Sequence, residues 1–304
     1  MSFRYQKLES IGEVEGKQVI LRVDWNVPIR GGKVYDDFRI QAAIPTIKYL
    51  MEHKASIIVM SHRDVSEDDS MRPVAEYLTE KFFPTVFVPD VDILALEGKL
   101  AGIAPGDVVL MENIRRFRGE ETGDSRFGKD LSRLGDIYVN EAFSVSHRRH
   151  ASIVELPKHL PSFAGLRFEQ EVETLSKTFN PGHPFLFVLG GAKFETKEPL
   201  IKKYLERADT VFVGGALAND YFAFKGLQVG RSRRSEVVPD LSQTVNHARL
   251  ALPIDVIVKQ ADGSRATLLP DQLKSDDAMF DAGPESIKFL KEKIKDAKLV
   301  VWNG

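Results

Sequence analysis

Cysteine is absent from the 304-residue chain, which excludes disulfide bonds, thiolate nucleophiles and cysteine-based metal sites. Long hydrophobic runs are also absent, because no apolar stretch approaches the roughly 20 residues that a membrane-spanning helix needs. The opening "MSFRYQKLES" is too polar for a signal peptide. We therefore expect a cytoplasmic protein that does not associate with a membrane.

A strong excess of either charge is also missing. The 42 lysine and arginine residues nearly balance the 44 aspartate and glutamate residues, and the formal net charge is -2. This balance argues against a broad nucleic-acid or membrane surface, although local basic clusters can still bind small anions. The sequence has no repeat or low-complexity block, and its 43% hydrophobic and 28% charged residues are typical of a globular protein.

Several familiar motifs are absent or incomplete. The chain has no Gly-x-Gly-x-x-Gly block and no Walker lysine loop. "SHRDVSEDD" contains the His-Arg-Asp triplet of protein kinases, but Asp69 stands where asparagine is expected, so we treat the match as coincidence. "HRRH" separates His147 and His150 by three positions, yet no further metal-ligand cluster lies nearby in sequence. Anion binding is the simpler interpretation of this stretch.

The length favours two domains, because single cores stop growing near ~250 to 300 residues. Short β-branched runs alternate with helix-period stretches, as in parallel sheets covered on both faces, and predict an α/β fold. We expect strands at 18–23, 55–60, 84–90, 107–113, 136–142, 185–191, 210–215, 254–258 and 299–304, and helices at 40–54, 71–82, 197–208 and 284–297.

The alternation is interrupted once, in "PKHLPSFAGLRFEQEVETLSKTFNPGHP". Prolines and glycines there bracket a polar amphipathic stretch, which predicts a connecting helix over 167–179. We therefore expect an N-terminal domain of residues 1–161, a linker with an interdomain helix at 162–183 and a C-terminal domain of residues 184–304.

Polar and basic side chains follow the strands of the N-terminal half. In open α/β sheets, ligands bind beyond the carboxyl ends of the strands, and guanidinium groups bind carboxylates and phosphates. The pattern predicts a small, doubly anionic substrate, with a set of unrelated surface arginines as the alternative. The residues are Asp24, Asn26, His62, Arg63, Arg115, Arg116, His147, Arg148, Arg149 and His150.

Glycines take these positions in the C-terminal half, in "VLGGAKFETK" and "VFVGGALAND". Glycine lets backbone amides approach a phosphate, and a following helix directs its positive end at the same anion. Structural turns also use strand-Gly-Gly, so this alternative stays open. Lys193 and Lys197 favour the nucleotide interpretation, because two positions four apart share one face of a helix.

Eight blocks, in this order, closely resemble the phosphoglycerate kinase family: "LRVDWNVPIRGGKVYDDFRIQAAIPTIKYL", "VVLMENIRRFRGEE", "YVNEAFSVSHRRHAS", "LGGAKFETK", "GGALAN", "LPIDV", "DAGPES" and "VVWNG". The resemblance covers essentially the whole chain. It implies two Rossmann-like three-layer domains joined by a hinge helix, the first binding 3-phosphoglycerate or 1,3-bisphosphoglycerate and the second ADP or ATP. It also implies a glycolytic monomer that transfers phosphate in line, with the magnesium complex of the nucleotide as substrate.

The resemblance assigns roles to individual positions. It implies an acid clamp, with Arg63 as a candidate for the arginine that the altered "SHRDVSEDD" loop lacks. Lys193 matches the lysine that follows the transferring phosphoryl group, and Lys197 the lysine that binds nucleotide phosphates. With Arg39 these lysines are the expected catalytic residues. The acid clamp comprises Asp24, Asn26, Arg39, His62, Arg115 and Arg148, and the nucleotide wall comprises Gly190, Gly191, Gly214, Gly215 and Asn303.

The sequence departs from the family pattern in several places. "SHRDVSEDD" replaces Ser-His-Leu-Gly-Arg-Pro, Thr196 and Glu141 each replace aspartate, and Ala216 replaces a third glycine. The family continues beyond Trp-Asn-Gly with a Gly-Gly-Gly-Asp segment whose aspartate holds magnesium. We therefore expect an incomplete second domain and no metal ligand in this chain. The alternatives are a degenerate or fragmentary member that binds phosphoglycerate without turnover and, more distantly, a dehydrogenase-like nucleotide domain.

Overall fold

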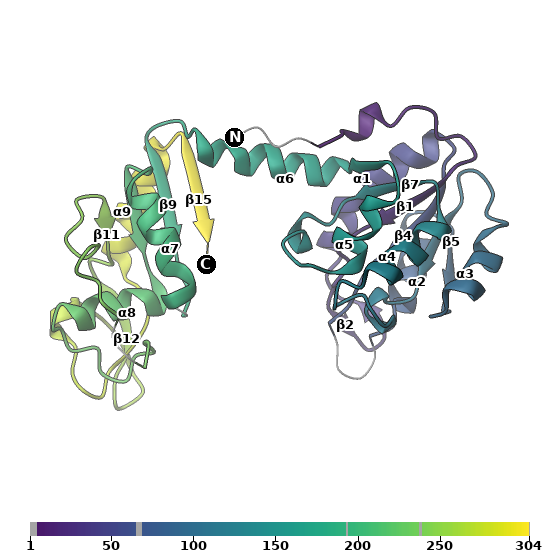
Figure 1. The fold of residues 1–304 in the computed structure, drawn as a ribbon. Helices are drawn as coiled ribbons and strands as arrows, with labels where there is room; N and C mark the ends of the chain where they lie inside the picture. The colour runs from purple at the N-terminus through teal and green to yellow at the C-terminus, as the bar shows by residue number, and fades with distance from the viewer. Residues whose placement is uncertain (1–4, 65–68, 193, 237–238, 304) are drawn as a thin grey trace. The chain divides into compact units, whose positions relative to one another are not determined.

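The computed structural model describes residues 5–64, 69–192, 194–236 and 239–303. The chain divides into two compact units, Met1–Leu175 and Ser176–Gly304, called here the N-terminal and C-terminal units (Figure 1). This division falls within the segment 162–183 that the sequence marks as a linker.

A six-stranded parallel sheet forms the centre of the N-terminal unit, with strand order β5-β6-β4-β1-β7-β8. All five strands expected before residue 161 are confirmed. The edge strand β8 was missed, because its three residues lie among the prolines and glycines of the expected linker. The strands are β1 Gln18–Arg22, β4 Ser56–Met60, β5 Thr85–Val88, β6 Val108–Met111, β7 Ile137–Asn140 and β8 Ser162–Ala164, and a separate hairpin pairs β2 Ile29–Arg30 with β3 Lys33–Val34.

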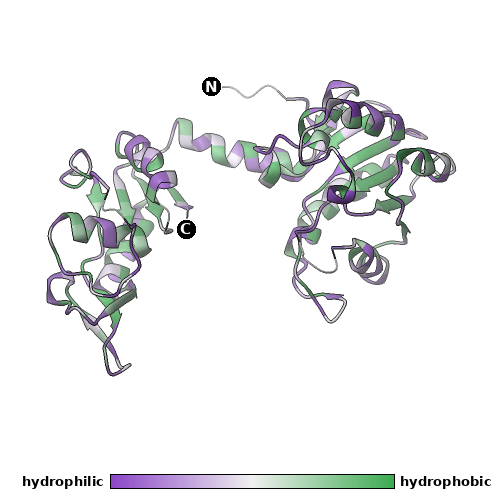
Figure 2. Cartoon of the chain, turned by 60° about the horizontal axis from the view of Figure 1, so that its bottom comes forward, coloured by the Kyte–Doolittle hydropathy of each residue, from purple (hydrophilic) through white to green (hydrophobic). Residues whose placement is uncertain are grey.

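Helices cover both faces of this sheet, because alternate residues of each buried strand point to opposite sides. Val19 and Leu21 pack in the core with α1 and α2, whereas Ile20 packs in the core with α3 and α4. Figure 2 shows hydrophobic residues concentrated on the central strands of this unit. The helices are α1 Phe38–Glu52, α2 Arg72–Lys81, α3 Ile93–Leu100, α4 Ser125–Leu131 and α5 Ala151–Val154.

The connecting helix α6 runs from Leu166 to Ser176, and the 3-10 helix η6, Lys177–Phe179, follows it. The sequence predicted one helix over 167–179. The helical segment therefore has nearly the expected extent, but its last three residues form a 3-10 helix instead of an α-helix. None of the helices in the described residues is long and apolar enough to cross a membrane.

The C-terminal unit has a four-stranded parallel sheet of order β11-β10-β9-β15. Phe185, Phe187 and Leu189 of β9 pack in the core with α7 and α8, and Leu186 and Val188 pack on the other face with α9. The α/β class with parallel sheets is confirmed. The elements are β9 Phe185–Leu189, α7 Phe194–Leu205, β10 Thr210–Val213, α8 Gly215–Phe224, β11 Leu250–Ala251, α9 Pro284–Asp296 and β15 Leu299–Asn303.

The strand expected at 254–258 is confirmed as β12, Val256–Lys259, but the prediction that it belongs to a parallel sheet is wrong. It is the middle strand of an antiparallel sheet with β13, Arg265–Leu268, and β14, Ala278–Ala282. A tight turn explains the difference, because the amide of Gly263, at φ +85°, donates to the carbonyl of Gln260 over 3.0 Å. A short turn joins only antiparallel neighbours, since a parallel pair needs a long crossover.

Candidate functional site

The acid clamp begins beyond β1, where Asp24 is held by two side chains. Nη1 of Arg39, in the first turn of α1, donates to Oδ2 of Asp24 over 2.8 Å, and the hydroxyl of Ser144 donates to the same oxygen. Burial raises the pKa of the Asp24 carboxyl, but the Ser144 hydrogen bond and the nearby His62 and Arg39 outweigh it, so the pKa lies below its ordinary value. An ionised Asp24 therefore orients Arg39, beside a cavity of about 180 Å³.

His62 follows β4 and is 1% exposed. Burial, together with the charges of Arg22 and Arg115, lowers the pKa of His62 to about 3, although Asp24 acts in the opposite direction. The imidazole is therefore neutral near pH 7. Nη2 of Arg22 lies 3.4 Å from Nδ1 of His62, and a guanidinium can only donate. Nδ1 is accordingly the acceptor, and Nε2 carries the proton that a ligand oxygen can accept.

A buried arginine in a strand supports this arrangement. Arg22 is fully buried, and its Nε donates over 3.0 Å to the hydroxyl of Ser152, which itself donates over 2.6 Å to Oε1 of Glu120. The sequence analysis did not select Arg22 or Glu120. The available signal for Arg22 was a charged residue inside the apolar run "QVILRV". A fully buried charge needs hydrogen-bonding or charged partners, so such a residue predicts a buried polar network.

Asn26 and Arg115 meet through Asp64, a residue that the sequence analysis did not select. Nδ2 of Asn26 donates to Oδ2 of Asp64 over 3.0 Å, and the amide of Asp64 donates to Oδ1 of Asn26 over 3.1 Å. Oδ1 of Asp64 forms an ion pair with Nη1 of Arg115, whose Nε lies 3.5 Å from Oε1 of Glu121. The structure therefore brings two expected clamp residues together around an acidic side chain.

Arg148 and Arg63 occupy different surroundings. Arg148 follows the 3-10 helix η4, Phe143–Val145, and its charge contributes to lowering the pKa of both His62 and Arg115 after the larger effect of burial. The structure thus places Arg148 close to the clamp. Nη1 of the buried Arg63 donates over 2.7 Å to the carbonyl of Ser70, so Arg63 holds its own loop, and its binding role stays a prediction.

In the C-terminal unit, the two glycine turns lie side by side. The amide of Gly190 donates to the carbonyl of Asn303 over 2.8 Å, and the amide of Gly214 donates to the carbonyl of Leu189 over 2.9 Å. Gly191 and Gly215 adopt φ +119° and +60°, where other residues are strained. A methyl group on Gly215 would lie 3.7 Å from the Gly191 amide nitrogen. Gly190, Gly191 and Gly214 are half-buried and Gly215 is exposed, so the two turns bring backbone to the surface of this unit.

Lys197 lies at this surface. Its Nζ donates to Oδ1 of Asn303, and a methyl group on Gly191 would lie 3.5 Å from its Cε. Together with Gly190, Gly191, Gly214 and Gly215, these two side chains form one cluster at the carboxyl ends of β9, β10 and β15. Lys193, the other expected phosphate-binding lysine, lies outside the described residues.

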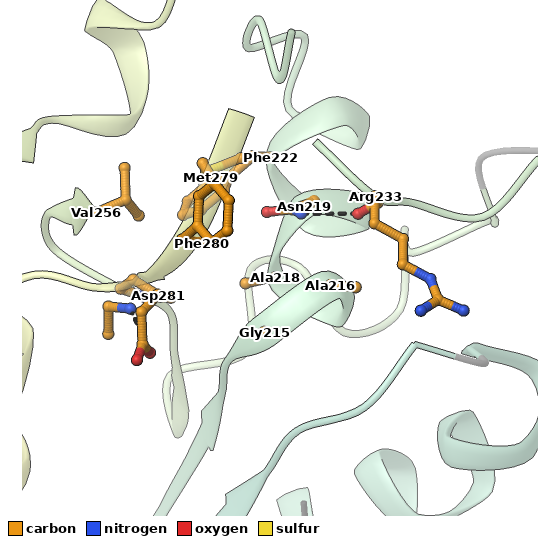
Figure 3. A pocket seen from close by; sticks show the side chains of 12 residues that line it. Gly215, Ala216, Ala218, Asn219, Phe222, Arg233, Val256, Met279, Phe280 and Asp281 are labelled. Atoms are coloured by element: carbon orange, nitrogen blue, oxygen red, sulfur yellow. Dashed lines mark hydrogen bonds between the residues drawn. The ribbon is translucent and has the colours of Figure 1, made fainter. Parts of the chain in front are cut away.

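A cavity of about 210 Å³ extends from Gly215 between α8 and β14 (Figure 3). Apolar side chains from both elements form its walls, and Nδ2 of Asn219 donates over 2.7 Å to the carbonyl of Arg233 at its rim. The sequence does not predict this cavity, because its walls come from segments about sixty positions apart, including a strand that was not expected. The apolar wall residues include Phe222, Val256, Met279 and Phe280.

The described residues contain no group of three or more His, Asp or Glu side chains that could hold a metal ion. The two candidate sites instead contain fixed cations and backbone amides, groups whose chemistry suits anions.

The sequence model of the family described as "Phosphoglycerate kinase" matches residues 8–304. Curated proteins with that name include those of Azorhizobium caulinodans, 38% identical over 309 residues, and Pseudothermotoga lettingae, 40% identical over 310 residues. Each alignment covers 96% of this chain and 78% of the relative. The solved structure of phosphoglycerate kinase from Coxiella burnetii is 30% identical with a TM-score of 0.83, and covers 99% of this chain and 80% of that one. The Pyrococcus horikoshii enzyme is 28% identical with a TM-score of 0.84, covering 98% and 80%.

Proposed function

The chain belongs to the phosphoglycerate kinase family, and from this premise we propose that it transfers a phosphoryl group reversibly between 1,3-bisphosphoglycerate and ADP. The observation that carries the proposal is the pairing of two anion sites of different chemistry in one chain. One is a clamp of arginines around a neutral histidine, and the other is a pair of glycine turns beside a lysine. The first suits a small phosphorylated acid, and the second suits the phosphates of a nucleotide.

In the N-terminal unit, we assign the acid to the clamp. Arg39, Arg115 and Arg148 supply permanent positive charge for its carboxylate and phosphate groups, with Arg63 as a further candidate. His62 and Asn26 donate hydrogen bonds without adding charge. The negative charge of Asp24 repels an anion. Its proposed role is therefore to orient Arg39, whose Nη1 donates a hydrogen bond to Asp24 over 2.8 Å.

In the C-terminal unit, we assign the nucleotide phosphates to the turns of Gly190, Gly191, Gly214 and Gly215. The amides of Gly191 and Gly215 are the proposed donors, because those of Gly190 and Gly214 already donate to the carbonyls of Asn303 and Leu189. Lys197 and Asn303 lie beside these amides, and Lys193 is proposed on sequence grounds. The apolar cavity that starts at Gly215 suits the flat base, since its Phe and Met side chains offer stacking surface. Magnesium enters as the metal of the bound ADP or ATP.

The reaction is a direct transfer. A terminal oxygen of the ADP β-phosphate bonds to the phosphorus of the acyl phosphate, and the bond from that phosphorus to the carboxyl oxygen breaks, giving ATP and 3-phosphoglycerate. No side chain forms a covalent intermediate. Arg39 and Lys193 are proposed to stabilise the charge on the equatorial oxygens, because each carries permanent positive charge.

A coupled assay on the 304-residue chain tests this proposal. Turnover that needs MgATP and 3-phosphoglycerate together supports it, and calorimetry with each ligand alone separates the alternatives. Binding of the acid without turnover would favour the non-catalytic alternative. We also propose a cytoplasmic monomer whose acid-binding domain, linker and nucleotide-binding domain span 1–161, 162–183 and 184–304. Sedimentation at equilibrium checks the oligomeric state.

A further inference from the structure

Asp64, in the loop after β4, binds two residues of the acid clamp. Its Oδ1 pairs with Nη1 of Arg115, and its Oδ2 accepts a hydrogen bond of 3.0 Å from Asn26. The backbone amide of Asp64 donates back to Asn26 over 3.1 Å. The chain's own carboxylate therefore uses the donors that the proposed function assigns to a carboxylate or phosphate of the substrate.

We propose that Asp64 is a tethered competitor for the acid clamp and sets its affinity for phosphorylated acids. The identity of the acid rests on the proposed function, but the competition itself does not. An incoming anion displaces the Asp64 carboxylate from Arg115 and Asn26, and the freed side chain turns into solvent.

The surroundings of Arg115 support displacement. Within the described residues, its buried Nε and Nη2 have no hydrogen-bond partner, so donor capacity remains for an anion. The Arg115 side chain is 11% exposed, whereas that of Asp64 is 42% exposed. Asp64 can therefore leave toward water while Arg115 stays in place. Glu121, the other acidic neighbour, is 61% exposed and sits at 3.5 Å.

The local charge explains why Asp64 occupies the clamp. After the larger effect of burial, Glu121 raises the pKa of Arg115, whereas the like charges of Arg148 and Arg22 lower it and so repel its protonated form. A carboxylate beside Arg115 relieves this repulsion. A bound acid relieves it too, but only after Asp64 is displaced. The measured Kd is therefore the intrinsic Kd divided by the fraction of clamps from which Asp64 has already moved away, here called open clamps.

Calorimetric titration of the full chain with inorganic phosphate, and separately with 3-phosphoglycerate, tests the inference. Asp64→Asn keeps the size of the side chain but removes its charge, and it should lower the Kd for both probes about tenfold, the gain for a clamp open about one tenth of the time. The matched control Glu121→Gln removes a charge near the same guanidinium and should change either Kd less than twofold. In an Arg115→Gln background, Asp64→Asn should give no gain.

Equal gains from Asp64→Asn and Glu121→Gln would overturn the inference, because bulk charge would then explain both. Unchanged affinity in a folded Asp64→Asn protein would overturn it as well. Asp64→Ser, which removes the carboxylate entirely, replaces the asparagine variant if that protein does not fold. If Asp64→Asn tightens binding of phosphate but no protein binds 3-phosphoglycerate, the proposed function fails and the inference stands. If parent and variant bind 3-phosphoglycerate equally, the function stands and the inference fails.

Discussion

Arg39 and Arg148 carry fixed charge beside the ends of the N-terminal strands, and their separate removal tests the clamp. We expect Arg39→Ala and Arg148→Ala each to weaken 3-phosphoglycerate binding by roughly 1.5 to 3 kcal/mol, the scale of a hydrogen bond to a charged group. Titration calorimetry measures the loss. Arg133→Ala is the matched control, because Arg133 pairs with Glu97 on the surface and should leave the affinity unchanged. Full affinity in both clamp variants would remove the assignment.

His62 makes the stability of the N-terminal unit depend on pH. The pKa of His62 in the folded state, about 3, lies below the ordinary value of 6.5. Between these two pH values the unfolded state binds a proton that the folded state does not bind. The contribution of His62 to the free energy of unfolding is fully present above pH 6.5 and is lost as the pH drops toward 3, by about 1.4 kcal/mol per pH unit. We expect His62→Gln to lose this part of the slope, measured by urea unfolding at pH 7 and pH 5.

The fluorescence of Trp25 reports this unfolding. Trp25 is fully buried in the N-terminal unit, and the only other tryptophan, Trp302, is 75% exposed in the C-terminal unit. His159→Gln is the control, because it removes an exposed histidine and should keep the parental slope. A slope that is the same in the parent and in His62→Gln would show that His62 titrates in the folded state.

At the residue scale, strand-end position selected four of the expected clamp residues but not the partners that set their charge, and their binding of an acid stays a prediction. Asp24, Asn26, His62 and Arg115 are recognisable because each follows an apolar run in the sequence. The partners that set their charge come from elsewhere in the fold. Arg22 fixes the tautomer of His62 from a neighbouring strand, and Asp64 occupies Arg115 from a loop. Contacts between side chains from different elements leave no periodic signal.

At the element scale, Glu141 is the side chain that joins β7 to α6. Its carboxylate accepts hydrogen bonds from the amides of Arg167 and Phe168, at 3.1 and 3.4 Å, and from the hydroxyl of Thr46 at 2.6 Å. These amides belong to the first turn of α6, where a negative charge is favourable. Burial nevertheless dominates and raises the pKa of Glu141 to about 7, although the hydrogen bonds act to lower it.

A raised pKa gives Glu141 the opposite effect on stability from His62. Between pH 4.5 and about 7, the folded state keeps a proton that the unfolded state has released, so the free energy of unfolding falls as pH rises. The whole window accounts for on the order of 3 kcal/mol. We expect Glu141→Gln to abolish this decrease, measured through Trp25 in urea at pH 5 and pH 8.

Because His62 opposes Glu141 in the overlapping window, the comparison must be between variants rather than between pH values of one protein. His62 is present in both the parent and Glu141→Gln, so its effect cancels from their difference. Glu171→Gln is the matched control, because Glu171 lies on α6 and pairs with Arg167, and this variant should follow the parent. Parallel pH curves for the parent and Glu141→Gln would contradict the assignment.

Elements with strong periodicity were predictable, and short ones were not. The buried runs of β1, β4 and β9 give continuous apolar signals, and α1, α2 and α9 give helical ones. β8 has three residues and β11 has two, too few to show alternation. β13 has only partly buried or exposed residues, so its sequence lacks the apolar run by which the other strands were found.

At the scale of the whole molecule, the order of the sequence blocks carried more information than any single site. Composition and strand ends predicted an anion site in each half, but neither named the acid or the nucleotide. Eight blocks in family order did so, and the match over residues 8–304 supports them. The sequence does not predict the cavity proposed for the nucleotide base, because α8 and β14 meet only in the folded C-terminal unit.

The two sites lie in separate units, so their binding reactions should be separable by mutation. Lys197→Ala removes a cation beside the Gly191 turn and should weaken MgADP binding at least tenfold, while 3-phosphoglycerate binding changes less than twofold. Arg39→Ala should show the reverse pattern. Calorimetry of both variants with each ligand measures all four values, and Lys225→Ala, an exposed lysine after α8, is the control for loss of charge. Loss of acid binding in Lys197→Ala would mean that one site spans both units, and the assignment of each ligand to its own unit would be wrong.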